Sequence, residues 1–161
     1  MLKIGKKFLV LVVLGLILSF PVFAQTAVRN LQKENLQKMY MNYLRQQGFH
    51  PFLDDAGDVY FTVGKDVFYI IVNENDQKYF HMYMGLRLGH TPLHNALIAA
   101  NYTNSRSKVA KVYISQDGRS ASINIELLVN KPRDFRRFFT RSISLIKNAE
   151  ANFLSELRHT M

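Results

Sequence analysis

The sequence predicts an α+β domain built on an antiparallel sheet. Apolar residues recur at helical spacing near both ends of the chain, whereas the middle holds short apolar segments divided by turns rich in Gly, Asp and Asn. With 161 residues and 48% hydrophobic content, the chain is long enough for one packed domain and too apolar for intrinsic disorder. We expect the order α-β-β-β-β-α-β-β-α, with the helices mainly on one face of the sheet.

The first 24 residues have the composition of a secretory signal peptide. Lys3, Lys6 and Lys7 precede an almost wholly apolar run, residues 8–20, and small residues lead to Ala24. We therefore expect cleavage after Ala24 and an exported protein, periplasmic or secreted, with a single domain over residues 25–161. The alternative is a retained membrane anchor, for which the apolar run is short.

The domain that follows this segment is still basic. Three of the 21 Lys and Arg residues precede residue 25, and none of the 12 Asp and Glu residues does, which leaves 18 bases against 12 acids. In an exported protein this excess favours anionic lipid, anionic glycan or an acidic polypeptide as the partner, and we expect no nucleic acid. The chain has no cysteine, which excludes disulfides and thiolate metal sites.

The domain is expected to begin with a helix followed by four short strands. The apolar face of the helix is defined by three- and four-residue steps: Leu31, Leu36, Met39, Tyr40, Tyr43 and Leu44. Gly48 stands where a left-handed residue would end that helix. Turn residues then separate strands that we expect at 49–53, 58–63, 67–72 and 77–86, which is the pattern of a meander.

The second half of the domain is expected to contain a helix, a hairpin and a last helix. Thr91 and Pro92 suit the N-cap and the first position of a helix that reaches about Tyr102. The pair Asp117-Gly118 lies between strands expected at 109–115 and 120–129. Asp134 can cap the last helix, whose core face carries Phe135, Phe138, Phe139, Ile146, Ala149, Phe153 and Leu157.

Five segments share their pattern with a known family: Asp58–Phe61, Val67–Val72, Ala99–Asn101, Lys111–Ile114 and the Phe-rich last helix. Together they resemble the bacterial sensory-transduction-regulator family, whose fold is similar to that of type III secretion chaperones. The likeness covers about residues 36–157. It implies a non-enzymatic domain, often paired as a homodimer, that offers strand edges and apolar patches to another polypeptide.

Alternation within the strands predicts one buried and one solvent-facing side of the sheet. In residues 121–129 the odd positions are apolar, whereas Ser122, Asn124 and Glu126 are polar. The same parity elsewhere gives the solvent-facing side five aromatic residues: Tyr60, Tyr79, His81, Tyr83 and Tyr113. Residues 67–72 are apolar throughout, so parity leaves the facing of that strand open, and we include its Tyr69 as a sixth candidate. Such a surface suits binding of a peptide, a sugar ring or a second copy of the domain. Strand propensity alone, or a covering loop or helix, would also explain these residues.

A second candidate surface is basic. At 100° per residue, one side of the last helix gathers five bases away from its Phe residues: Arg133, Arg136, Arg137, Arg141 and Lys147. This surface gives the alternative function, an envelope-surface binder that uses a basic amphipathic helix on anionic lipid or glycan. A solvated polar face is the simpler interpretation.

Motifs for catalysis and for metal binding are weak in this sequence. His90 and His94 are four residues apart, but Pro92 places His90 before the helix, and no third ligand lies nearby. Asp54, Asp55 and Asp58 lack the alternation of a calcium loop. No nucleophile elbow or phosphate loop occurs. We expect no enzyme, metal or cofactor, and an exported protein-interaction or chaperone-like domain that binds a polypeptide through an open sheet face or strand edge.

Overall fold

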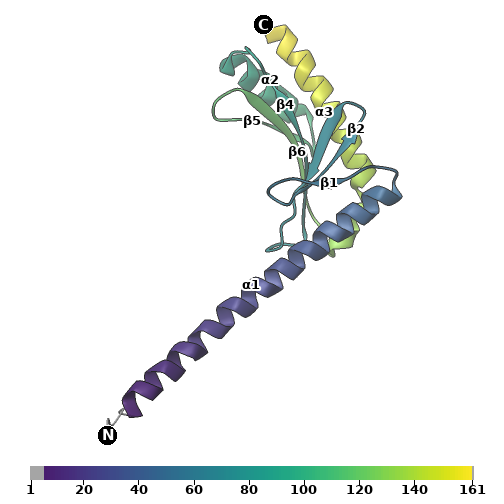
Figure 1. Ribbon diagram of the computed structural model, residues 1–161. Coiled ribbons are helices and arrows are strands. Elements are labelled where there is room, and N and C mark those ends of the chain that lie inside the picture. The colour runs from purple at the N-terminus through teal and green to yellow at the C-terminus, as the bar shows by residue number, and fades with distance from the viewer. Residues whose placement is uncertain (1–5, 161) are drawn as a thin grey trace.

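A computed structural model describes the backbone of residues 6–160 and the side chains of residues 25–160. The elements follow one another along the chain (Figure 1) as α1 (Lys6–Gln46), β1 (Phe52–Leu53), β2 (Val59–Val63), β3 (Asp66–Ile70), β4 (Tyr79–Arg87), α2 (Leu93–Arg106), β5 (Lys111–Ile114), β6 (Ser120–Leu128), the 3₁₀ helix η1 (Pro132–Arg137) and α3 (Phe139–Thr160). The expected α+β class and element order are confirmed.

The expected signal peptide, residues 1–24, falls on positions whose side chains lie outside this description. Cleavage after Ala24 therefore stays a prediction. Among residues 25–160, whose side chains are described, no helix is both long enough and apolar enough to cross a membrane.

All six strands form one antiparallel sheet in the order β1-β2-β3-β4-β6-β5. The longest ladder joins β4 and β6, from Tyr79 opposite Leu128 to Arg87 opposite Ser120. Strand β5 is much shorter and pairs with β6 only between Ala121 and Asn124. Helix α2 connects β4 to β5 along the chain. In the sheet, β6 lies between these two strands and pairs with both.

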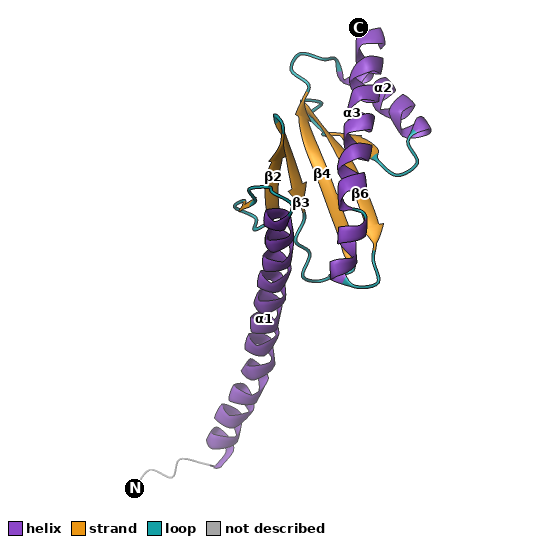
Figure 2. Cartoon of the chain, turned by 90° about the vertical axis from the view of Figure 1, so that its right-hand side faces the viewer, coloured by secondary structure: helices purple, strands orange, loops and turns teal. Residues whose placement is uncertain are grey.

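The hydrophobic core lies on one face of the sheet. Alternate residues of the central strands point into it and are fully buried, including Phe61, Phe68, Met82 and Ile125. Helix α3 lies across this face (Figure 2), and its Phe139, Ile146 and Phe153 are buried against it. The last turns of α1 and helix α2 complete the core, so the helices cover mainly one side of the sheet.

Helix α1 joins the domain only over its last turns. Leu36, Tyr40 and Leu44 recur every four residues and are buried. Gly48 adopts a left-handed conformation with φ of 85°, and the Phe49 N–H donates to the Leu44 carbonyl at 3.0 Å, which ends the helix as expected. Leu31 was expected on the core face but is 58% exposed, because α1 leaves the domain before that turn (Figure 1).

The other two helices begin later than the sequence suggested. Pro92, rather than Thr91, is the N-cap of α2, and no side chain caps this helix, which extends to Arg106. The expected last helix is divided into η1 and α3. Asp134 accepts the Lys131 N–H at 3.0 Å and starts η1, and the Phe138 N–H donates to the Phe135 carbonyl at 2.9 Å in the tighter 3₁₀ pattern.

This break in the helix changes the place of one aromatic residue. Phe135 and Phe139 both point into the core, whereas Phe138, which the sequence placed there too, is 41% exposed. Phe135 lies edge-on to Tyr40 and Tyr43 of α1, with ring centroids 4.9 and 5.0 Å apart. It thereby joins η1 to the first helix.

Candidate functional site

A row of aromatic side chains crosses four strands on the face of the sheet opposite the core. The strand register places Phe52 beside Tyr60, Tyr60 beside Tyr69, and Tyr69 beside Tyr83. The ring centroids of these three pairs are 5.6, 5.9 and 4.9 Å apart, and the Tyr69 and Tyr83 rings are nearly parallel, at 11°. Phe52 is 56% exposed, and the three tyrosines are half-buried. We call these four residues the aromatic row.

The same line continues into polar groups on the last two strands. Tyr83 lies beside Asn124 of β6, and Asn124 lies beside Lys111 of β5. Asn124 Nδ2 donates to Ser122 Oγ at 2.9 Å, so its Oδ1 faces His81 and accepts the His81 Nε2–H at 2.8 Å. This bond holds the His81 ring on the open face between Tyr79 and Tyr83.

Hydrogen bonding and burial alter the acidity of two tyrosines on this face. The Tyr79 hydroxyl donates to Glu126 Oε2 at 2.5 Å, and this bond to a carboxylate raises the pKa of Tyr79 to about 12. Burial raises the pKa of Tyr83, and the neighbouring Tyr69, Asp58 and Asp54 raise it further. Both side chains therefore present neutral hydroxyl groups at physiological pH.

The structure places all six predicted aromatic residues on the open face, but it groups them unequally. Tyr60, Tyr69 and Tyr83 are neighbours in the aromatic row, where the Tyr69 and Tyr83 rings stack, and Tyr79 and His81 follow along β4. Tyr113 lies apart on β5, opposite Ser122, and is 53% exposed. Phe52 also belongs to the row, although strand alternation in the sequence did not place it there. A hairpin register counted outward from the turn at residues 54–58 would have revealed it.

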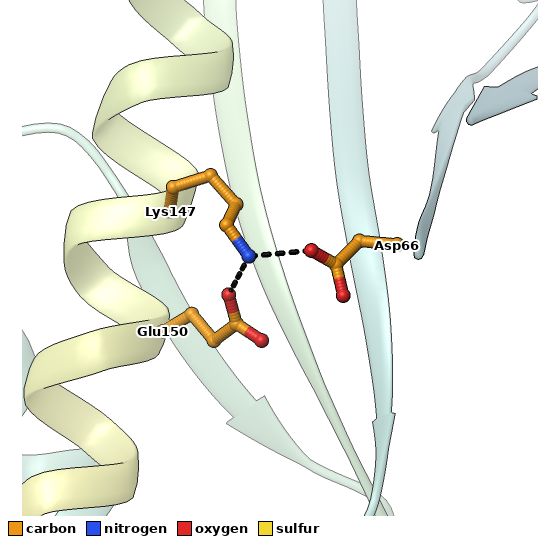
Figure 3. A network of polar contacts seen from close by, with 3 residues as sticks. All are labelled: Asp66, Lys147 and Glu150. Carbon is orange, nitrogen blue, oxygen red and sulfur yellow. Dashed lines mark hydrogen bonds and ion pairs between the residues drawn. The ribbon is translucent and has the colours of Figure 1, made fainter. Parts of the chain in front are cut away.

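The five predicted basic residues do not form one helical surface. Arg133, Arg136 and Arg137 belong to η1, and only Arg141 and Lys147 belong to α3. Lys147 is not free to bind an anion. As Figure 3 shows, its ammonium donates to Asp66 Oδ2 at 2.5 Å and also to Glu150 of its own helix. Burial lowers the pKa of Lys147, but the two hydrogen bonds and ion pairs together raise it above the ordinary value.

The residues considered as metal ligands are dispersed. His90 precedes α2, His94 lies in its first turn, and both are exposed. Asp54 instead organises the turn before β2, because its Oδ1 accepts the Ala56 and Asp58 N–H groups at 3.0 and 2.9 Å. Within residues 25–160 no three His, Asp or Glu side chains gather closely enough to hold a metal ion.

Comparisons with known proteins support the fold. No protein-family model matches the sequence, and no curated protein matches it. YbjN from E. coli is similar in structure, with a TM-score of 0.57 and 12% identity over 74% of this chain and 90% of its own. A protein from Methanothermobacter thermautotrophicus gives a TM-score of 0.56 and 12% identity over 77% and 97%.

A third solved structure, the HopA1–SchA chaperone–effector complex, gives a TM-score of 0.46 at 11% identity, over 76% of this chain and 93% of the matched chain. At such low identities these likenesses concern the fold alone. The resemblance to the sensory-transduction-regulator family is therefore supported at the level of the fold.

Proposed function

We propose that this chain is an exported, non-enzymatic protein-interaction domain of chaperone-like fold that binds a polypeptide across the open face of its sheet. The observation that carries the proposal is the aromatic row, four neighbouring rings on the side opposite the core. Tyrosine buries a large area when a partner binds and loses little conformational entropy, while its hydroxyl remains able to form hydrogen bonds. These properties make such a row a suitable centre for an interface.

The dimensions and chemistry of this line of residues fit a polypeptide. Adjacent strands lie about 4.8 Å apart, so a line across six strands is about 24 Å long, the length of about seven residues of extended chain. The line begins with the apolar Phe52 and continues through tyrosines to Asn124 and Lys111. Asn124 is buried and bonded to His81 and Ser122, and the Lys111 ammonium donates to the Asn104 and Ser107 carbonyls. The part of the line that a peptide can contact is therefore the aromatic row, whose rings suit apolar side chains and whose hydroxyls suit backbone amides.

The strand edges are less suitable than the face. At β5, the Val112 N–H donates to Asn104 Oδ1 at 2.7 Å, and Asn104 Nδ2 donates to the Val112 carbonyl at 3.0 Å. This side chain of α2 therefore satisfies the outer backbone groups that an added strand would need. The opposite edge, β1, is only two residues long. Of the two modes that the sequence left open, face binding is the one that these contacts favour.

Affinity capture with matched variants tests the proposal. The wild-type chain, the double variant Tyr69→Thr with Tyr83→Thr, and the control Ser144→Ala with Asn148→Ala on the exposed side of α3 would be incubated with envelope extract. Thr keeps the β-propensity of both positions, and circular dichroism verifies that each variant is folded.

We expect the wild type and the control to retain the same discrete polypeptide and the double Thr variant to retain at least tenfold less, because central aromatic contacts dominate interface energies. Equal retention by all three proteins would contradict the proposal. If the retained polypeptide is this chain itself, the open face is a homodimer surface instead of a site for a different partner.

A further inference from the structure

The end of the domain formed by the last residue of β6, η1 and the first turn of α3 is strongly basic. Residues 128–141 contain five bases and one acid. All five bases are exposed: Lys131, Arg133, Arg136, Arg137 and Arg141. No carboxylate within residues 25–160 forms an ion pair with any of them, and the single acid, Asp134, is bonded to the Lys131 backbone.

Two large apolar side chains project among these charges. Leu128 is 82% exposed, the highest value among the large hydrophobic residues described, and Phe138 is 41% exposed. Both border a hollow of about 110 Å³ together with Arg137. Phe138 also borders a second hollow of about 280 Å³, lined by the apolar Leu127 and Leu145 and by Arg141. Exposed apolar residues thus stand next to Arg137 and Arg141, which form no ion pair within residues 25–160.

We infer that this basic end docks on the surface of an anionic lipid bilayer, with Leu128 and Phe138 entering the headgroup region and the arginines contacting lipid phosphates. Basic side chains near a negatively charged leaflet and apolar side chains at the interface contribute additively, and stable reversible attachment generally needs both. This site lies outside the aromatic row and does not depend on the function proposed for it.

The geometry of the domain is compatible with both surfaces being used together. Strands β4 and β6 meet the basic end at Tyr79 and Leu128 and extend away from it for nine residues. Leu128 lies opposite Tyr79 at the end of the open face, so a bilayer that takes up Leu128 would meet the strand ends there and leave the aromatic row, which reaches β4 at Tyr83, accessible. Helix α1 passes beside η1, where the Tyr43 hydroxyl donates to the Arg136 carbonyl at 3.4 Å, and extends beyond the same end of the sheet (Figure 2).

Vesicle co-sedimentation tests the inference with the full chain. The probes are vesicles of 30% phosphatidylglycerol in phosphatidylcholine and vesicles of pure phosphatidylcholine. The test variants are Arg137→Glu with Arg141→Glu, and Leu128→Ser. The matched control, Lys65→Glu with Arg87→Glu, makes the same change in net charge with exposed residues at the other end of the sheet. The N-terminal residues are identical in all four proteins.

We expect binding to the anionic vesicles that weakens as salt is raised. The arginine reversal should lower it about tenfold or more and Leu128→Ser about fivefold, with the control within about twofold of wild type. An equal loss in the control would show that net charge alone matters and would overturn the inference. Salt-insensitive binding, equal on both kinds of vesicle, would assign attachment to the N-terminal apolar run. Binding to polyglutamate but to neither vesicle would make the basic end a site for an acidic polypeptide.

Discussion

Tyr79 has the most distinctive pH behaviour on the open face. Its hydroxyl donates to Glu126, and the bond raises its pKa to about 12. Because the folded-state pKa is raised above the ordinary tyrosine value of 10.0, the stabilisation from this bond is fully present below pH 10 and is lost as the pH rises towards 12. The contact between β4 and β6 at this end of the sheet should therefore weaken only in strong alkali.

We predict that Glu126→Gln lowers the pKa of Tyr79 towards 10.0, because the variant replaces the carboxylate that accepts the Tyr79 hydrogen bond and whose charge also opposes ionisation. The measurement is the tyrosine Cζ chemical shift in labelled protein between pH 8 and pH 12.5, with Tyr79→Phe identifying the signal. A Tyr79 titration that is the same in wild type and Glu126→Gln would show that the hydrogen bond is absent in solution.

Among the contacts between elements, Lys147 joins α3 to the β3 strand. Its ammonium lies between Asp66 and Glu150, whose side chains are only 14% and 11% exposed (Figure 3). Without the lysine, two poorly hydrated carboxylates would lie near each other without a cation. We predict that Lys147→Gln lowers the free energy of unfolding at pH 7 by about 1–3 kcal/mol, measured by urea denaturation.

The pH dependence of this loss has a defined sign. The pKa of Lys147 is raised above 10.5, so its stabilisation is present below that pH and disappears as the pH rises through the folded-state pKa. The difference between wild type and Lys147→Gln should therefore shrink in strong alkali. Lys38→Gln is the matched control. Its pair with Glu34 is exposed, at 3.5 Å, and should contribute less than about 0.5 kcal/mol. Equal effects of the two substitutions would contradict this assignment.

The 3₁₀ helix η1 is held in place by Phe135. This fully buried ring contacts Tyr40, Tyr43, Phe80 and Phe139, which belong to three other elements. We predict that Phe135→Ala lowers the free energy of unfolding by about 3–5 kcal/mol, because the cavity would lie where α1, β4 and α3 meet.

Phe138 is the control for this prediction. It is the same residue type in the next turn, and Phe138→Ala should cost less than about 1 kcal/mol because the ring is largely outside the core. Denaturant unfolding of both variants measures the difference. Similar losses of unfolding free energy in the two variants would contradict the placement of Phe135 in the core and of Phe138 at the surface.

At the scale of the whole molecule, the sequence predicted the sheet more accurately than the helices. Period-two alternation assigned five residues to the open face: Tyr60, Tyr79, His81, Tyr83 and Tyr113. In the structure they lie on that face, together with Tyr69. The alternation is reliable because successive side chains in a strand point to opposite faces of the sheet. Which tyrosines stack could not be predicted, since stacking depends on the register between strands.

Helical periodicity was less reliable where the chain changed from one type of helix to another. A uniform 100° step across residues 134–157 placed Phe138 in the core and Lys147 beside the arginines. In the structure, the 3₁₀ geometry of η1 interrupts the 100° periodicity, and Asp66 of β3 accepts a hydrogen bond from the Lys147 ammonium. A single sequence indicates neither a 3₁₀ segment nor a charge partner 81 residues away.

Site-specific photo-crosslinking in the producing cell tests the proposed use of the open face most directly. Benzoylphenylalanine would replace Tyr60 or Tyr113 on the open face, and Ser144 or Asn148 on the exposed side of α3. We predict a discrete adduct with one other polypeptide at both open-face positions and none at the α3 positions. Adducts that form only at the α3 positions, or the same adducts at all four, would contradict a binding function for the tyrosine-bearing face.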